Sequence, residues 1–191
     1  SLFRECVAFF VFEDPRGYLN SLHSLGLCYN RIGNYGLCSE TNKKGLLEGK
    51  RLGLTTMDSY FIHSEGINQY ALKNYRDAIK QINYSLAVIK ENKDFANQAV
   101  GYFYIGKSYW QLNEHETAFS YFKKVIQIIE AKNYIRPDLR ENYELIISYY
   151  KSKDDLNNQL YYIQKLLKVD KILESRYRYL SNKIHKEYDT K

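Results

Sequence analysis

The sequence lacks a long apolar run. Its longest such run, from Cys6 to Phe12, is far shorter than the roughly 18 to 20 residues that a membrane-spanning helix requires. Cysteine is also scarce, and three residues, an odd number, exclude a small domain built on a disulfide framework. We expect no cleavable signal sequence. Because the chain is apolar from its first residues, we expect a soluble excerpt of a longer protein.

The composition excludes disorder and does not require a nucleic-acid partner. Aromatic residues make up 16% of the 191 residues, with twenty tyrosines, which is enough apolar area to offset chain entropy. The net charge is +6, and residues 171–191 hold six basic and three acidic side chains, so half of that charge lies in this last segment. A nucleic-acid-binding body normally carries a basic stripe across its fold. We therefore expect this chain to bind no nucleic acid.

Three glycines recur at a spacing of 40 residues, and each is followed twelve residues later by a small side chain. The pairs are Gly26 with Cys38, Gly66 with Ala78, and Gly106 with Ala118. Breaks in the helical pattern are expected at residues 32–35, 72–75 and 112–115. Between them, apolar residues fall at helical spacing, which predicts antiparallel helices whose backbones approach closely at the small residues. Pro15 and Pro137 stand where first helices of such hairpins begin. A degraded fourth copy runs through Ile147 and Tyr150, one residue out of phase.

These residues resemble the tetratricopeptide repeat, most clearly from Leu25 through Gly33 and Tyr35 to Cys38, and from Tyr102 to Phe122. The resemblance covers about residues 15–170. It departs from the family in its 40-residue period, against a usual period of about 34, and in lacking the proline that closes each repeat. It implies an all-α fold, a right-handed α-solenoid of tetratricopeptide-like helical hairpins.

The expected organisation has three parts. Residues 1–14 are the second helix of a truncated upstream hairpin, the repeats run over about 15–54, 55–93, 94–135 and 136–170, and residues 171–191 form a C-terminal capping helix. In that last segment one helix face would carry Leu173, Tyr177, Leu180, Ile184 and Tyr188. We expect this face to cover the last repeat.

Residues 160–170 and 179–189 are similar to the segment that closes the repeat region in certain bacterial transcription regulators. In those membrane-anchored proteins, tetratricopeptide repeats form the sensor, a transmembrane helix follows, and an AraC-type helix-turn-helix domain binds DNA. The resemblance implies that this chain is the sensor portion, attached to the bacterial inner membrane only through a segment beyond Lys191. Homodimerisation remains open.

The sequence motifs predict no catalytic centre, metal site or cofactor. Gly101–Ser108 formally matches the phosphate-binding pattern G-x-x-x-x-G-K-[ST], but no strand is expected before it and bulky residues fill the variable positions. His115 and Glu116 begin like a zinc-protease signature, but the position of the second histidine is Phe119. The cysteines Cys6, Cys28 and Cys38 have no metal-ligand spacing.

A binding surface is therefore the predicted functional feature. The first helices of such hairpins line a concave groove, and their outward residues recur in register. The ligand-binding prediction comprises Asn20, His23, Asn30, Tyr60, His63, Tyr70, Phe103, Tyr104, Lys107 and Trp110. Tyrosine and tryptophan anchor interfaces, and asparagine can bond a peptide backbone. The alternative is that Tyr60, Tyr70 and Phe103 pack between hairpins.

The predicted function is non-catalytic recognition of a peptide or protein ligand by a sensor module. Two alternatives remain at this point. One is a soluble regulator of the peptide-pheromone-receptor kind, which also uses long hairpins. The other is a solenoid that binds single-stranded nucleic acid by stacking bases on aromatic side chains.

Overall fold

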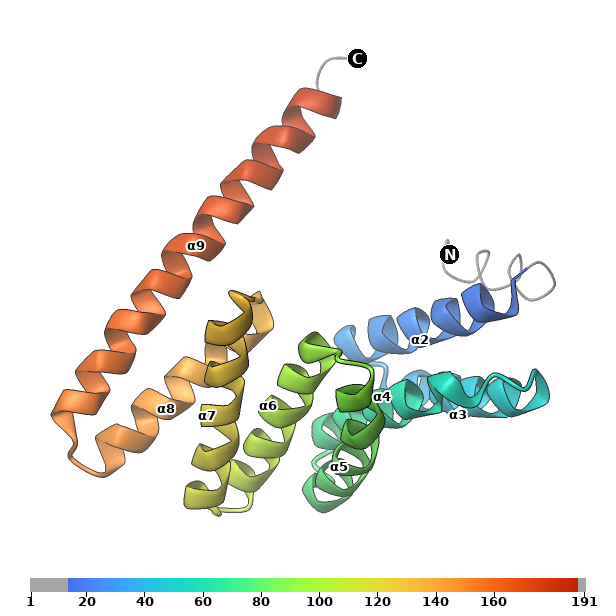
Figure 1. Ribbon diagram of the computed structural model, residues 1–191, viewed down its shortest axis with the longest axis horizontal. Helices are drawn as coiled ribbons and strands as arrows, with labels where there is room; N and C mark the ends of the chain where they lie inside the picture. Colours follow the sequence, from blue (N-terminus) through green and yellow to red (C-terminus); the bar gives the residue numbers. More distant parts are fainter. Residues whose placement is uncertain (1–13, 189–191) are drawn as a thin grey trace. The chain divides into compact units, whose positions relative to one another are not determined.

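The computed structural model describes residues 14–188, with side chains through Lys183, and all regular structure within that range is helical. The chain divides into two compact units, Ser1–Glu114 and His115–Lys191. The first unit contains α2 (Pro15–Arg31), α3 (Tyr35–Arg51), the 3₁₀ turn η1 (Thr55–Met57), α4 (Asp58–Ala71), α5 (Tyr75–Glu91) and α6 (Phe95–Gln111) (Figure 1). The second contains α7 (His115–Lys132), η2 (Pro137–Leu139), α8 (Arg140–Ser152) and α9 (Leu156–Tyr188).

The 40-residue period arises from two copies of a 20-residue unit. The helices α2, α3, α5 and α6 have 17 residues each, about 25 Å of helix. One or two residues after the end of most helices comes a residue with left-handed backbone angles; these residues are Gly33, Gly53, Lys73, Lys93, Asn113 and Asn133, spaced by 20, and then Asp154. The next backbone N–H bonds back into the last turn, as from Asn34 to the Tyr29 carbonyl at 2.9 Å. This pattern is the Schellman helix end.

Helix starts agree with the sequence signals. The Asp14 carboxylate caps α2 by accepting a hydrogen bond from the Arg16 backbone, and Pro15 is the first helical residue. Asn34 and Asp94 cap α3 and α6 in the same way. Pro137 begins η2, three residues before the α-helix of the fourth hairpin. The breaks predicted at residues 32–35, 72–75 and 112–115 are the turns between helices.

The expected close helix crossing is confirmed at Gly66. A Cβ atom at Gly66 would lie 3.3 Å from the Ala78 carbonyl oxygen and 2.5 Å from Cγ1 of Ile82, so only glycine fits there. At Gly26 the nearest neighbour is Asn42, at 3.0 Å, which is one turn beyond the expected Cys38. The third pair, Gly106 and Ala118, spans the two units, and its contact stays a prediction.

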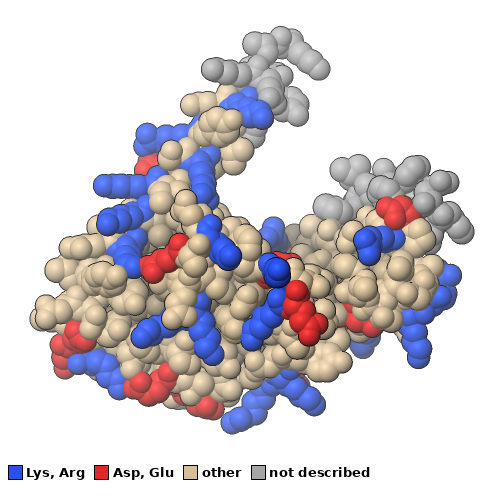
Figure 2. All heavy atoms as spheres, in the orientation of Figure 1, with Lys and Arg blue, Asp and Glu red and all other residues tan. Residues whose placement is uncertain are grey.

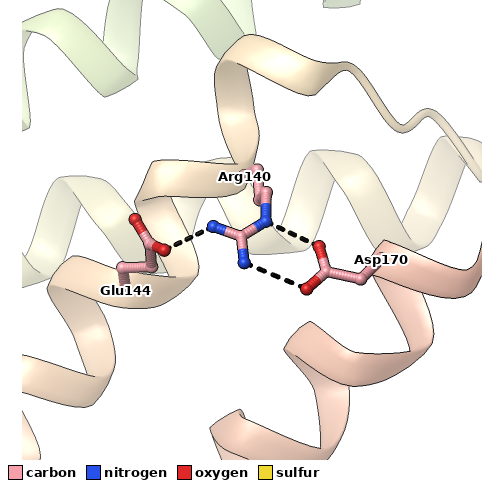
Figure 3. A network of polar contacts seen from close by, with 3 residues as sticks. All are labelled: Arg140, Glu144 and Asp170. Atoms are coloured by element: carbon pink, nitrogen blue, oxygen red, sulfur yellow. Dashed lines mark hydrogen bonds and ion pairs between the residues drawn. The ribbon is translucent and has the colours of Figure 1, made fainter. Parts of the chain in front are cut away.

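The C-terminal organisation differs from the expectation. No helix ends at residue 170, since α9 runs for 33 residues without a break and joins the expected second helix and capping helix into one. The sequence across that point contains neither glycine nor proline, so nothing stops the helix. Near the junction, the Arg140 guanidinium makes two hydrogen bonds to Asp170, at 2.6 and 3.0 Å, and also bonds Glu144 (Figure 3). These contacts hold α9 against α8.

The face of α9 expected to cover the last repeat is largely open. Tyr177 is 74% exposed and Leu180 is 55% exposed. The prediction of an upstream helix over residues 1–14 concerns residues outside the described range, apart from Asp14. Over residues 14–188, no helix combines the length and the apolar character that crossing a membrane requires.

Candidate functional site

The ten predicted ligand-binding residues all lie on α2, α4 and α6, which contact one another in that order within the first unit. These are the first helices of three successive hairpins. The members that reach solvent define what we call the first-helix surface: Asn20, His23, Asn30, Tyr60, Tyr70, Tyr104, Lys107 and Trp110. The structure arranges most of these residues in two clusters.

The first cluster surrounds the Lys107 side chain. Its ammonium nitrogen lies 5.0 Å from the ring centre of Tyr70, 5.2 Å from that of Phe103 and 5.9 Å from that of Tyr104. Tyr70 and Tyr104 also meet edge to face at 5.3 Å, so α4 and α6 are joined by their rings. Cation–π contact holds a positive charge at a fixed place on an otherwise aromatic surface. This arrangement suits an anionic group on a ligand.

The second cluster surrounds two histidines. His23 meets Tyr60 and Phe61 edge to face at 6.1 and 5.7 Å. Burial lowers the pKa of His23, and a hydrogen bond to the Tyr60 backbone opposes this shift. Burial also lowers the pKa of His63, to about 4, with a further contribution from the nearby His23. Both imidazoles are therefore neutral at pH 7.

Two of the predicted residues are not available to a ligand. His63 is 3% exposed and Phe103 is 2% exposed, so both pack between helices. A Cβ atom at Gly101 would lie 2.9 Å from Nε2 of His63, which shows how closely α6 approaches α4 there. Asn30 keeps partial exposure, but its amide donates a 2.9 Å hydrogen bond to Asn68. For Phe103, the alternative interpretation, packing between hairpins, is the correct one.

Sequence reasoning missed a partly buried polar network between α3 and α4. The Glu65 carboxylate accepts hydrogen bonds from Ser39 at 2.7 Å, from Asn42 at 2.9 Å and from Gln69 at 2.7 Å. Asn68, which is fully buried, donates to the Tyr35 carbonyl and to Ser39. The network joins the two hairpins through these bonds, while the buried Asn42 Oδ1 has no hydrogen-bond partner among the described residues.

The signal for this network is present in the repeat alignment. Asn42 occupies the same repeat position as Ile82 and Phe122. Glu65 occupies the same repeat position as Leu25 and Ile105. A polar side chain in an otherwise apolar row is expected to find a buried partner. A comparison of equivalent positions in successive repeats would therefore have predicted that Asn42 and Glu65 contact each other.

The described residues provide little for covalent chemistry. Burial raises the pKa of the Cys38 thiol to about 11, so it stays protonated at neutral pH and is a poor nucleophile. Gly101–Ser108 lies inside α6, where the backbone N–H groups belong to helix hydrogen bonds and cannot cradle a phosphate. Among residues 14–183, whose side chains the structure describes, no group of three metal-binding side chains occurs.

Solved structures share this fold. No protein-family model and no curated protein matches the chain. MamA superposes with a TM-score of 0.60 and 21% identity, over 88% of this chain and 87% of its own. A STAND signal-transduction ATPase with a tetratricopeptide repeat sensor, from Pyrococcus horikoshii, superposes with a TM-score of 0.65 and 18% identity. The match covers 97% of this chain and 28% of that protein. A protein of nearly identical TPR-like repeats from Podosopora anserina superposes with a TM-score of 0.58 and 13% identity, over 91% of this chain and 86% of its own. At these identities the likeness shows the fold alone, an all-α solenoid of tetratricopeptide-like hairpins.

Proposed function

From the tetratricopeptide-like fold, we propose that this chain is a non-catalytic interaction module that binds a peptide segment of another protein on its first-helix surface. The observation that carries the proposal is the Lys107 ammonium held among the rings of Tyr70, Phe103 and Tyr104. A fixed cation beside tyrosine rings offers one charged and several apolar contacts. The ligand we propose is therefore an aromatic or apolar peptide carrying a carboxylate.

Within a larger protein, this module would act as the sensor of a regulator. That context rests on the resemblance of residues 160–170 and 179–189 to the end of such sensor regions, and on the STAND protein, whose own repeats are described as a sensor. A sensor transmits a signal only when its ligand binds two states of the array with different affinities. The proposal thus requires that peptide binding and array geometry be coupled.

The test is selection of peptides from a displayed random library on the intact chain, followed by measurement of dissociation constants. Trp110 is the only tryptophan and lies half-buried on α6, so its fluorescence should report binding. Tyr70→Ala and Lys107→Ala should each weaken binding by about tenfold or more, equivalent to about 1.4 kcal/mol. Tyr84→Ala is the matched control, since Tyr84 is 69% exposed on the second helix α5.

Three results would reject the proposal. If Tyr84→Ala and Tyr70→Ala weakened peptide binding equally, the peptide would bind elsewhere on the chain. If the peptides bound all variants with the same affinity, the first-helix surface would have no part in binding. Tight binding of single-stranded nucleic acid that weakens steeply with added salt would favour the alternative function. Circular dichroism of each variant separates loss of binding from loss of folding.

A further inference from the structure

The helix α9 extends far beyond the helix on which it packs. It has 33 residues, whereas α8 has 13. Val169, next to the Asp170 that binds Arg140 at the start of α8, is 6% exposed. The same apolar stripe continues at helical spacing through Leu173, Tyr177 and Leu180, and the last two of these are 74% and 55% exposed. The face that packs on α8 therefore continues without a cover.

This uncovered stripe borders a hollow of about 510 Å³. Its apolar walls are Ile135 from the loop after α7, Pro137 at the start of η2, and Leu173, Tyr177 and Leu180 from α9. The Arg176 side chain donates a 2.9 Å hydrogen bond to the Ile135 carbonyl and so holds the loop against the helix. Binding cavities for large ligand groups are of this size and character. We call this hollow the α9 pocket.

The charges around the α9 pocket are unbalanced toward the positive. Glu174, which lines it, is bonded to Arg178 at 2.5 Å. Arg176 also lines the pocket, and the partner of its guanidinium is the Ile135 carbonyl oxygen, which carries no formal charge. A smaller hollow of about 250 Å³ shares Ile135 and is lined by Lys168, which has no ion pair among the residues described. Blue side chains follow α9 on the face shown in Figure 2, and red ones are few there.

Such a surface fits the helix-in-groove mode of recognition, in which an amphipathic helix places apolar side chains in a hollow. A second copy of this chain is the weaker candidate, because residues 171–191 carry a net charge of +3 and pairing them would bring like charges together. We infer that the α9 pocket binds an acidic amphipathic helix of another protein. A bulky apolar side chain of that helix enters the pocket, and its carboxylates meet Lys168 and Arg176.

The test uses two synthetic amphipathic helices of about five turns with the same leucine stripe. One carries glutamates beside the stripe and the other carries lysines. Fluorescence anisotropy with the intact chain should show the acidic peptide binding at least about tenfold more tightly than the basic one. Tyr177→Ala should weaken the acidic peptide by about tenfold. Tyr179→Ala should not, because Tyr179 is exposed on the same helix but does not line the pocket.

Both tyrosines are exposed, so neither substitution endangers the fold. Equal binding of the two peptides, or equal losses for the two variants, would overturn the inference. So would a dimer in sedimentation analysis that Tyr177→Ala dissociates, since the occupant would then be a second copy. Binding to vesicles of phosphatidylcholine and phosphatidylserine, lost in Tyr177→Ala, would assign the surface to lipid instead. Tyr70→Ala should leave the acidic peptide unaffected, which separates this site from the first-helix surface.

Discussion

At one position of the repeat the contact between α3 and α4 is polar, and the equivalent contact one repeat later, between α5 and α6, is apolar. In the first, Asn42 donates a 2.9 Å hydrogen bond to Glu65. At the same repeat positions, 40 residues on, the second has Ile82 and Ile105, both fully buried. Two chemically different solutions therefore occupy one position of the same architecture.

The difference shows what each kind of contact demands. Apolar burial stabilises in proportion to area and tolerates small changes of direction, but it requires close filling of space. A polar contact depends on its hydrogen bonds being made, since a buried polar group without a partner is penalised; here the partly buried Glu65 carboxylate accepts three of them. The α3–α4 contact therefore depends at this position on the direction of its hydrogen bonds, whereas the α5–α6 contact depends on close filling of space.

Removing Ile82 should have the largest effect. Ile82 fills the space between Gly66 and Gly101, whose added Cβ atoms would lie 2.5 and 3.1 Å from it. Ile82→Ala should lower the free energy of unfolding by about 2–5 kcal/mol through lost burial and the cavity it leaves. Urea denaturation measures this change. Ile32→Ala, at a residue that is 74% exposed, is the matched control and should change stability by less than about 0.5 kcal/mol. If both variants lost similar free energy of unfolding, burial of Ile82 would not stabilise the α5–α6 contact.

Acid should destabilise the α4–α6 contact through His63. Its pKa is about 4 in the folded chain and 6.5 as the ordinary value, because burial disfavours the charged imidazole. Protons therefore bind the unfolded chain more readily than the folded one. The stability that neutral His63 contributes is present in full above about pH 6.5 and is lost as the pH falls from 6.5 toward 4. The loss is roughly 3 kcal/mol.

The measurement is the urea midpoint between pH 7 and pH 4 for the natural chain and for His63→Leu. The variant should lose less stability over that interval, because leucine takes up no proton. Other groups that face His63 belong to the same comparison: His23 on α2, Asp94 before α6 and the backbone of Asn97. Parallel pH profiles for the two proteins would show that His63 is not responsible.

Breaking the polar contact at one side should cost less than losing Ile82. Asn42→Ile removes one donor to Glu65 and should lower the free energy of unfolding by about 1–3 kcal/mol. Adding Glu65→Ile recreates the apolar pair of the next repeat, so the double variant should be more stable than the sum of the single changes predicts, by about 0.5–3 kcal/mol. A double-mutant cycle measured by urea denaturation gives this coupling. Strict additivity would mean that Asn42 and Glu65 act independently.

The repeat architecture was predictable because its signals are local and recur. Gly66 is required where α4 and α5 cross, and its place in the 40-residue recurrence identified that crossing. Turn positions were predictable for the same reason. The continuity of α9 past residue 170 was not, since an expected domain end does not by itself stop a helix.

The candidate site was predictable only in part. Periodicity placed the ten residues on the first helices, but it could not tell an outward side chain from one covered by the next helix, as with His63 and Phe103. Neither could it show that Lys107 lies among three rings, because those rings come from two helices that are distant in sequence. Such contacts depend on packing between repeats, which a single helix pattern does not encode.

The turns of the first two repeats offer the smallest expected effect. The left-handed position after α2 is Gly33, with φ 78°, and the equivalent position after α4 is Lys73, with φ 65°. A side chain there is disfavoured by about 1–2 kcal/mol, which the greater chain entropy of glycine partly offsets. Lys73→Gly should therefore raise the free energy of unfolding by up to about 1 kcal/mol, and Gly33→Ala should lower it by a similar amount. No atom lies within 4 Å of a Cβ atom at Gly33, so that change tests the backbone alone. If urea denaturation shows both changes to be neutral, the lysine turn of the second repeat is as relaxed as the glycine turn of the first, and the two repeats differ only in their side-chain contacts.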